Sequence, residues 1–211
     1  MRCIAFFSMK NLKCNFSDIY RTEDFLDGTV LDFTTLDETC CYCSERSAKV
    51  IREALAPYGP GGLHWLDSGD YHYVSLFIQE MIQEPYSLVL FDNHPDNQHG
   101  AFGRELLSCG SWVSEVRKLP NWRESSHNVY ISIDKDVLGR DYARTDWDQG
   151  NMTLDQLFSA IRDISLNHRI IGVDVCGELT LLKGACSEDV SINSKTNRLI
   201  QDFLLNLPGF E

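Results

Sequence analysis

The 211-residue sequence lacks any apolar stretch that approaches the roughly 20 residues needed to span a membrane. It also lacks low-complexity segments, internal repeats and an evident linker, which predicts one domain over residues 1–211. The apolar run at 3–7 is not followed by a small-residue cleavage site. We therefore interpret that run as a first strand rather than as part of a signal peptide.

Positive charge is scarce, with 19 Lys and Arg residues against 31 Asp and Glu residues and a formal net charge of −12. A chain this acidic is repelled by nucleic-acid phosphates and by anionic lipids, so we expect neither nucleic acid nor a membrane as a partner. The same charge suits a metal cation or a small cationic substrate. Self-association into a homo-oligomer stays open.

Cysteine is not scarce, but its arrangement lacks the second Cys/His pair of a zinc ribbon or zinc finger. Cys40, Cys41 and Cys43 form the densest group among eight cysteines. A chain of this length can build a core without disulfides, and no secretion signal is recognised. We therefore expect a cytoplasmic protein, with these three residues as free thiols in a loop before a helix.

Apolar runs alternate with helical patterns along the chain. Strands are predicted at 3–7, 62–66, 86–91, 128–133 and 169–175, and helices at 44–59, 73–83, 110–119, 153–166 and 194–205. Thr153 and Gln156 have the spacing of a capping box at the start of a helix. Strands that alternate with helices form right-handed βαβ units, so the predicted class is α/β with a mainly parallel sheet.

Acidic or imidazole side chains follow four of the predicted strands. They are Asp70 and His72, Asp92 with His94 and Asp96, Asp134 with Asp136, and Glu178. Ligands of open parallel sheets bind outside the carboxyl ends of the strands. We therefore expect these side chains to converge at one edge of the sheet.

The spacing of these residues indicates a metal centre. In an extended segment alternate residues share a face, so the three ligand-type side chains of "DNHPD" (92–96) can point together. Asp134 and Asp136 can do the same with Lys135 turned outward, and His72 is a sixth ligand candidate. Packed carboxylates need a cation to stay ionised. Six ligands exceed the three of a catalytic zinc and suffice for two metals with shared carboxylates. Oxygen-rich coordination with two imidazoles favours Mn²⁺, with Zn²⁺, Fe²⁺ and Co²⁺ left open.

Each motif alone is also typical of a solvent-exposed turn, because Asp, Asn and Pro favour turns. Their joint occurrence at predicted strand ends favours the metal centre. The remaining histidines carry no assigned role: His64 lies within a strand, and His99, His127 and His168 lie in loops or at helix ends.

These segments resemble, in order, the signatures of the arginase/agmatinase/formiminoglutamase superfamily, the ureohydrolases. "SGDYHY" (68–73) corresponds to a Gly-Asp-His segment, "DNHPD" (92–96) to Asp-Ala-His-x-Asp, "SIDKD" (132–136) to Ser-x-Asp-x-Asp, and "DVCGEL" (174–179) to a later glutamate. The resemblance extends from about residue 62 to 180. It implies an arginase-like three-layer α/β/α fold, two Mn²⁺ ions per chain at the carboxyl edge of the sheet, and hydrolysis of linear amidines.

The resemblance also implies a role for each residue. His72, Asp92, Asp96 and Asp134 would hold one metal, and Asp92, His94, Asp134 and Asp136 the other. Asp92 and Asp134 would then bridge the two ions. A shared water of lowered pKa would attack a guanidinium or similar carbon as hydroxide. Asp136 would stabilise the attacking group, and Glu178 would pair with the cationic nitrogens of the substrate.

The chain departs from the family pattern at several points. Tyr71 stands near the position of the family histidine, and we assign that role to His72 because tyrosine is a rarer ligand. Cys109 in "LLSCGSW" (106–112) stands where the family often has a proton-shuttling histidine. Cys109 is therefore a candidate catalytic residue, although a thiol could not shuttle protons in the same way. No pattern for binding an amino-acid α-carboxylate is visible, so the metal centre is better supported than arginine as the substrate. The expected substrate is a guanidino, formimino or related small cationic compound.

Other functions compete with a C–N hydrolase. A deacetylase would use one zinc, which the six-ligand set disfavours, and a metallophosphoesterase would need further His and Asn ligands late in the chain. A non-catalytic metal-binding protein on a hydrolase fold is favoured by the missing histidine at Cys109. Cys109 is disfavoured as a nucleophile, since no paired histidine is identifiable.

Overall fold

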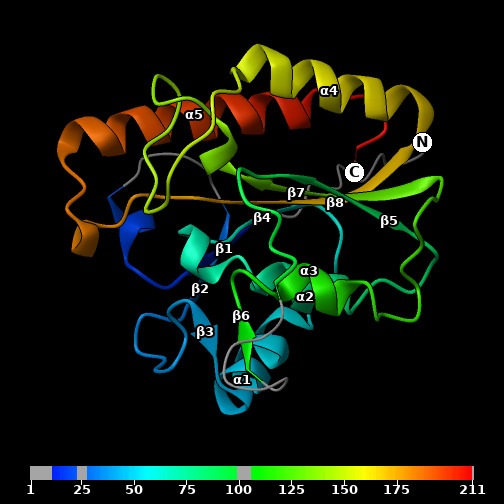
Figure 1. Ribbon diagram of the computed structural model, residues 1–211, viewed down its shortest axis with the longest axis horizontal. Coiled ribbons are helices and arrows are strands. Elements are labelled where there is room, and N and C mark those ends of the chain that lie inside the picture. The colour runs from blue at the N-terminus through cyan, green and yellow to red at the C-terminus, as the bar shows by residue number, and fades with distance from the viewer. Residues whose placement is uncertain (1–10, 23–27, 99–105, 211) are drawn as a thin grey trace, which may run out of the picture.

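A six-stranded parallel sheet forms the centre of the computed structural model, which describes residues 11–22, 28–98 and 106–210 (Figure 1). The strand order is β2-β1-β4-β8-β7-β5, and every neighbouring pair is parallel. The strands are β1 (Asn11–Asn15), β2 (Thr29–Asp32), β4 (Leu63–Trp65), β5 (Ser87–Phe91), β7 (Asn128–Asp134) and β8 (Arg169–Cys176).

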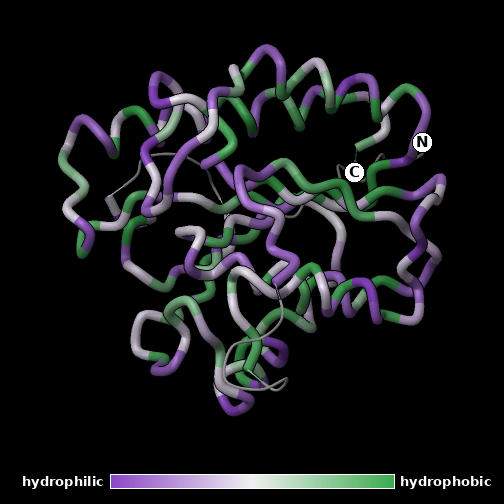
Figure 2. The backbone as a smooth tube through the Cα atoms, viewed as in Figure 1, coloured by the Kyte–Doolittle hydropathy of each residue, from purple (hydrophilic) through white to green (hydrophobic). Residues whose placement is uncertain are grey.

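Helices cover both faces of this sheet (Figure 1). On one face lie α4 (Leu154–Asn167) and α5 (Ser187–Leu205), and on the other lie α1 (Glu45–Leu55), α2 (Val74–Gln79) and α3 (Trp112–Val116). In Figure 2 the hydrophobic colour concentrates on the central strands, whereas α4 alternates between hydrophobic and hydrophilic residues. Two buried apolar clusters fill the two sheet–helix interfaces. The predicted three-layer α/β/α class is therefore confirmed.

The strands that carry the predicted ligands are those that the sequence located best. The expected strands at 62–66, 86–91, 128–133 and 169–175 correspond to β4, β5, β7 and β8. Most apolar residues of β4, β7 and β8 are buried from both faces, as parallel strands between helix layers require, whereas those of the edge strand β5 are partly buried. Because all four strands run in the same direction, their carboxyl ends meet at one edge of the sheet.

The N-terminal part of the sheet differs from the prediction. The expected strand at 3–7 lies outside the described residues, and β1 and β2 were not predicted. In β1, Leu12 and Cys14 are buried between polar residues, so this strand carries only two apolar side chains. A short antiparallel pair, β3 (Tyr42–Cys43) and β6 (Leu107–Ser108), was also missed. Two-residue strands are set by their tertiary partner, not by a pattern of their own.

The helices begin near the expected residues, with one exception. Thr153 and Gln156 form the predicted capping box at the start of α4. Helix α5 begins at Ser187, seven residues before the predicted start, because Asp189 accepts a hydrogen bond from the Cys186 backbone N–H there. Short 3-10 helices complete the chain: η1 (Ile19–Arg21), η2 (Gly69–Tyr71), η3 (Lys135–Val137) and η4 (Leu181–Lys183). Within the described residues, no helix combines the length and apolar character that crossing a membrane requires.

Candidate metal centre

The segment after β5 brings Asp92, His94 and Asp96 to the carboxyl edge of the sheet, but not by strand alternation. The strand ends at Phe91, and residues 92–96 leave the extended conformation. Asp96 has a φ of 45°, in the left-handed region that Asp tolerates better than most residues. Its carboxylate accepts a hydrogen bond of 2.7 Å from Trp112 Nε1. The convergence was predicted, and the extended geometry proposed for it is wrong.

The second aspartate motif is likewise not extended. Asp134 ends β7 and caps η3, because its Oδ1 accepts a hydrogen bond of 2.9 Å from the Asp136 backbone N–H. The prediction that Lys135 turns outward is wrong: its side chain is fully buried and forms an ion pair with Glu178. Asn197 of α5 joins this pair, since its Oδ1 accepts from Lys135 Nζ at 2.9 Å and its Nδ2 donates to Glu178 at 2.8 Å. The 3-10 turn directs Lys135 into the interior beneath α5.

His72, at the end of η2, faces three carboxylates. Its Nδ1 lies 3.0 Å from Asp96 Oδ2, 3.4 Å from Asp92 Oδ2 and 3.6 Å from Asp134 Oδ2. Tyr71 instead stacks on Phe16 with ring centroids 4.2 Å apart. The structure therefore places His72, rather than Tyr71, among the aspartates.

His94 forms a second group with Asp92 and Asp136. Its Nδ1 lies 2.7 Å from Asp136 Oδ2 and 3.8 Å from Asp92 Oδ1. Asp92 thus faces both histidines, one with each carboxylate oxygen. The six predicted ligands are all brought together, with Asp92 between the two groups.

The geometry of both groups fits divalent metal ions. At metal–ligand distances of about 2.1 Å, neighbouring ligand atoms lie about 3.0 Å apart in an octahedron and about 3.4 Å apart in a tetrahedron. The separations of 2.7–3.8 Å within these groups span those values. Two buried atoms that face each other, His72 Nδ1 and Asp92 Oδ2, have no hydrogen-bond partner among the residues that the structure describes. A metal ion would satisfy both.

The pKa values of the aspartates and histidines in these two groups also favour a bound cation. Burial, followed by the negative charges of Asp134 and Asp92, raises the pKa of Asp136 to about 8. Burial also raises the pKa of Asp134 to about 6, with the Asp92 charge acting in the same direction. For His72 and His94 burial lowers the pKa, but the surrounding negative groups outweigh it and raise the pKa above its usual value. Without a cation, the group therefore retains protons.

A buried hydrogen-bond relay behind His72 was not anticipated from the sequence. Ser132 Oγ donates to Asp174 Oδ1 at 2.5 Å and lies 2.8 Å from His72 Nε2. Because the only hydroxyl proton of Ser132 is donated to Asp174, Ser132 Oγ accepts a hydrogen bond from His72 Nε2–H. In the neutral imidazole, Nδ1 then carries no proton and can bind a metal ion. Ser75 Oγ donates to the other Asp174 oxygen at 2.5 Å. The available signal was the polar Ser132 and Asp174 inside otherwise apolar strands.

Gly177 makes room for Asp134. It has a φ of +93°, and a Cβ at this position would lie 2.4 Å from Asp134 Oδ1. Cys176, the last residue of β8, donates from Sγ to Asp134 Oδ2 at 3.1 Å. The end of β8 therefore supports the carboxylate from behind, another contribution that the sequence patterns did not reveal.

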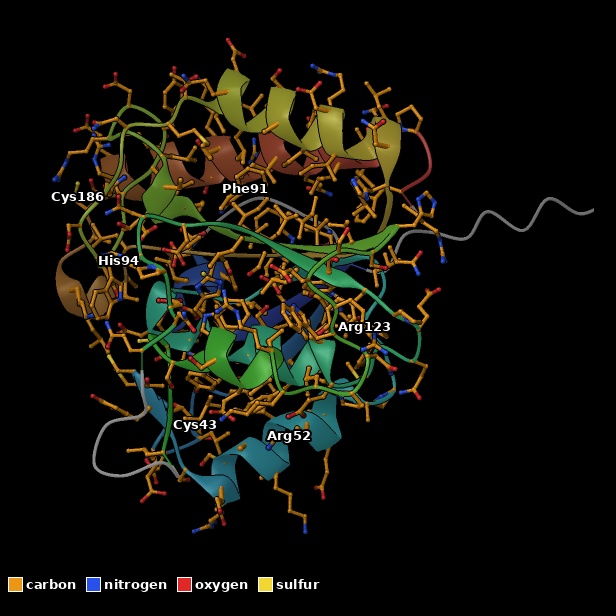
Figure 3. All side chains as sticks on the ribbon, turned by 45° about the vertical axis from the view of Figure 1, so that its right-hand side comes forward. Cys43, Arg52, Phe91, His94, Arg123 and Cys186 are labelled. Carbon is orange, nitrogen blue, oxygen red and sulfur yellow. The ribbon has the colours of Figure 1, made fainter. Side chains whose placement is uncertain are left out.

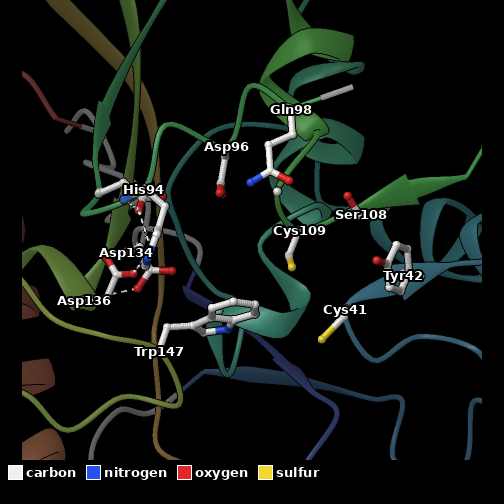
Figure 4. A pocket seen from close by; sticks show the side chains of 13 residues that line it. Cys41, Tyr42, His94, Asp96, Gln98, Ser108, Cys109, Asp134, Asp136 and Trp147 are labelled. Carbon is white, nitrogen blue, oxygen red and sulfur yellow. Dashed lines mark hydrogen bonds and ion pairs between the residues drawn. The ribbon is translucent and has the colours of Figure 1, made fainter. Parts of the chain in front are cut away.

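A cavity of about 270 Å³ opens onto the group (Figure 4). In Figure 4, His94, Asp134 and Asp136 lie on one wall, whereas Cys41 and Cys109 lie on another. Burial, followed by the charges of Asp96 and Asp70, raises the pKa of the Cys109 thiol to about 12. The remaining lining residues are Tyr42, Gly69, Asp92, Asp96, Gln98, Ser108, Gly110 and Trp147.

Glu178 is absent from the described lining of this cavity: its Oε1 accepts from Lys135 and Asn197, and its buried Oε2 has no hydrogen-bond partner among the described residues. Its predicted pairing with a substrate stays a prediction. In the described part of the chain no lysine or arginine lines the cavity. The wall of carboxylates is thus open to an added cation.

A comparison with known proteins identifies one relative that matches most of the chain. No family model matches the sequence. An uncharacterized protein of Thermotoga maritima is 32% identical over 182 residues, which cover 71% of this chain and 72% of that protein.

Solved structures resemble the fold at much lower sequence identity. Arginase from Bacillus subtilis superposes with a TM-score of 0.60 at 10% identity, covering 94% of this chain and 98% of that one. Arginase from Medicago truncatula superposes with a TM-score of 0.55 at 18% identity, covering 76% of this chain and 64% of that one. The matched region thus spans less than two thirds of the Medicago enzyme. The chain belongs to the same family as the Thermotoga protein, and its fold is that of the arginase/agmatinase/formiminoglutamase superfamily, the ureohydrolases.

Proposed function

We propose that the protein is a metal-dependent hydrolase of non-peptide C–N bonds, acting on a guanidino, formimino or related small cationic compound. One observation carries the proposal: four aspartates and His94 line a cavity of about 270 Å³, and the buried His72 faces three of these aspartates at 3.0–3.6 Å. No lysine or arginine lines this cavity within the described residues. The arginase-like fold supports the reaction class by analogy, since a fold alone does not determine function.

The ligand assignment follows the two groups. His72, Asp92, Asp96 and Asp134 would hold one ion, and Asp92, His94, Asp134 and Asp136 the other. Two bound Mn²⁺ ions would supply Lewis acidity and a water of lowered pKa near neutral pH. Zn²⁺, Fe²⁺ or Co²⁺ would serve the same geometry.

The residues of the chain supply orientation and charge. Ser132 and Asp174 hold the proton of His72 on Nε2, so that Nδ1 faces the carboxylates. Asp136 stands at the cavity surface and would accept a hydrogen bond from the attacking group, as carboxylates do in acid–base catalysis. The negative wall would attract a cationic substrate into the cavity. Cys109, with its raised pKa, would stay protonated at the cavity wall and would not act as a base near neutral pH.

A non-catalytic metal-binding protein is the second candidate. It is favoured by the thiol of Cys109 at the place where related enzymes often have a proton-shuttling histidine. Both candidates share the metal centre, a small-molecule partner and a cytoplasmic setting, and neither excludes a homo-oligomer. They differ only in turnover.

The first experiment measures metal content and then activity. Metal analysis of the purified protein after manganese loading should find about two ions per chain. A screen of guanidino and formimino compounds should then score urea or ammonia release with Mn²⁺ present. Protein that stays metal-free after manganese soaking rejects the centre. Bound metal without turnover of any compound supports the second candidate, and activity on phosphate or acetyl esters alone assigns a different hydrolase class.

A further inference from the structure

The cysteines at the cavity wall take no part in the proposed reaction. Cys41 and Cys109 face each other across the short antiparallel pair of β3 and β6, in which Tyr42 is opposite Ser108 and Cys43 is opposite Leu107. The Cys109 backbone N–H donates to the Cys41 carbonyl at 2.9 Å, which continues this pairing by one step. Two thiols therefore border the cavity on the side away from His94 and Asp136 (Figure 4).

Cys40, Cys41 and the buried Asp70 form a compact triad of ligand-type atoms. Cys40 Sγ lies 3.3 Å from Asp70 Oδ2, and Cys41 Sγ lies 3.3 Å from Asp70 Oδ1. The two sulfurs are 4.0 Å apart. For a tetrahedral zinc ion with Zn–S of about 2.3 Å and Zn–O of about 2.0 Å, two sulfurs are separated by about 3.8 Å and a sulfur and an oxygen by about 3.5 Å. The sulfur–sulfur distance is close to this value. Each sulfur contacts a different oxygen of the carboxylate, and one ligand atom from each of the three residues lies within 4.8 Å of the other two. A small rotation of the Asp70 carboxylate would bring one oxygen toward both sulfurs.

The backbone at Cys41 provides an independent observation. Cys41 has a φ of 59°, which is rare for residues other than Gly, Asn and Asp. The Tyr42 N–H donates to the Cys40 carbonyl at 2.7 Å, so Cys41 is the centre of a tight three-residue turn with positive φ, a rare and strained form. In an extended chain neighbouring side chains point to opposite faces. Here the turn directs two consecutive thiols to the same carboxylate.

We propose that Cys40, Cys41 and Asp70 form a separate binding site for a thiophilic divalent cation such as Zn²⁺ at the rim of the cavity. A solvent molecule or the Cys109 thiol completes the tetrahedron. Each bound ion replaces one proton on each of the two thiols, and both protons pass to solvent. This site does not depend on the proposed hydrolase activity.

Existing contacts of Asp70 are compatible with this exchange. Asp70 Oδ2 accepts from Lys183 Nζ at 2.9 Å, and Oδ1 accepts from Trp147 Nε1 at 2.9 Å. The Lys183 side chain is partly exposed, and its Nζ also lies 3.6 Å from Asp146 Oδ2. Asp146 can therefore keep the Lys183 ammonium paired when a cation binds to Asp70. Thiolates select softer ions than carboxylates and imidazoles do. The two sites of the cavity are therefore distinguished by the metals that they prefer.

Cobalt titration of the full-length, reduced and metal-depleted protein tests this site. We expect a thiolate-to-cobalt charge-transfer absorption whose intensity corresponds to one thiolate-bound ion per chain, separate from cobalt held by the carboxylate centre, and which Zn²⁺ abolishes by displacement. Cys40→Ser and Cys41→Ser should each weaken cobalt binding at this site at least about tenfold, as loss of a metal-site group does. Cys43→Ser is the matched control, because Cys43 directs its thiol to the Ser44 carbonyl, in the layer of α1 and Arg52 (Figure 3).

Further variants assign the absorption to this site. Asp92→Asn should retain the charge-transfer band, because Asp92 belongs to the other centre. Asp70→Asn should weaken the band and provides a test that leaves both thiols in place. Absence of the band in the wild-type protein overturns the proposal. A band that persists in the Cys40→Ser/Cys41→Ser double variant but disappears in Cys176→Ser also overturns the proposal. The thiolate that binds cobalt would then be Cys176, beside Asp134.

Discussion

Two buried charged clusters lie on either side of η3 and differ in where their cation comes from. In the first, Lys135 supplies the positive charge and Glu178 the negative charge, and Lys135 and Asn197 both donate to the same oxygen, Glu178 Oε1. In the second, aspartates outnumber histidines, and no lysine or arginine lies among the described residues that line the cavity. Each cluster also has one buried carboxylate oxygen without a hydrogen-bond partner among the described residues, Glu178 Oε2 in the first and Asp92 Oδ2 in the second. Lys135 and Asp136 are adjacent in sequence, yet the 3-10 turn separates them into these two clusters.

The difference indicates what each cluster is for. A buried ion pair whose charges balance within the protein serves the fold and does not require an added cation. A buried set of carboxylates with raised pKa values, open to a cavity, is incomplete without a cation. We therefore expect the first cluster to respond to mutation through stability and the second through metal binding.

Removal of the shared carboxylate should have the largest effect. Asp92→Asn, and in the same way Asp134→Asn, should abolish metal binding at both positions and reduce any turnover below detection, because each would bridge the two ions. Metal content and urea or ammonia release measure this. Asp148→Asn is the control, since Asp148 is exposed and lies 3.6 Å from His94 Nε2. Unchanged stoichiometry in Asp92→Asn would reject the bridging role.

Breaking the first cluster, the Lys135–Glu178 ion pair, should instead destabilise the fold. Lys135→Met leaves Glu178 buried without its cation, which costs about 3–5 kcal/mol in comparable buried pairs. The double variant Lys135→Met/Glu178→Gln should recover much of this loss. Lys118→Met, which removes an exposed partner of Glu115, should cost less than about 1 kcal/mol. Urea unfolding compares the variants, and equal losses for Lys135→Met and Lys118→Met would contradict the assignment.

Loss of the hydrogen-bond relay behind His72 should have an intermediate effect on the metal affinity of the second cluster. Ser132→Ala removes the link between His72 and Asp174 and should weaken metal affinity about 10–100-fold, as other changes behind metal-binding histidines do. Ser75→Ala removes a neighbouring bond to the same aspartate and leaves the Ser132 link in place. Metal titration calorimetry distinguishes the two. A purely structural role would reduce stability equally in both variants and leave the affinities alike.

The pH dependence of the metal-free protein tests the comparison without any substitution. The pKa values of about 6 for Asp134 and about 8 for Asp136 exceed those of an unfolded chain, about 3.9. The folded state therefore binds more protons than the unfolded state between pH 4 and 8, so the free energy of unfolding falls as pH rises. The raised pKa values of His72 and His94 act in the same direction.

Thermal unfolding at pH 5 and pH 8 measures this slope. With a chelator present, the midpoint should be lower at pH 8 than at pH 5. Added Mn²⁺ should restore it, mainly at the higher pH, because metal ions bind deprotonated ligands. A metal-free protein that is more stable at pH 8 than at pH 5 would show that other groups dominate.

The sequence indicated the second cluster, of aspartates and histidines, more reliably than the first, of Lys135 and Glu178. Apolar strands that end in Asp92, Asp134 and the segment before His72 predicted a common edge, and the parallel sheet places them there. The burial of Lys135 was not predictable, because alternation in a strand and rotation in a 3-10 turn assign opposite directions to the same residue. The Cys40–Cys41 pair was interpreted as free thiols, since its carboxylate partner Asp70 lies about 30 residues further along the chain.

By itself the sequence determined the α/β class, four of the six strands of the central sheet and the six ligand-type residues that follow its strands. It could do so because apolar runs and the acids that follow them are local patterns, and parallel strands impose a common edge. Only the tertiary structure decided which oxygen faces which imidazole, that Glu178 is paired with Lys135, and that two thiols share Asp70. Those features depend on turns and on contacts between distant segments, where a rotation of one residue redirects its charge.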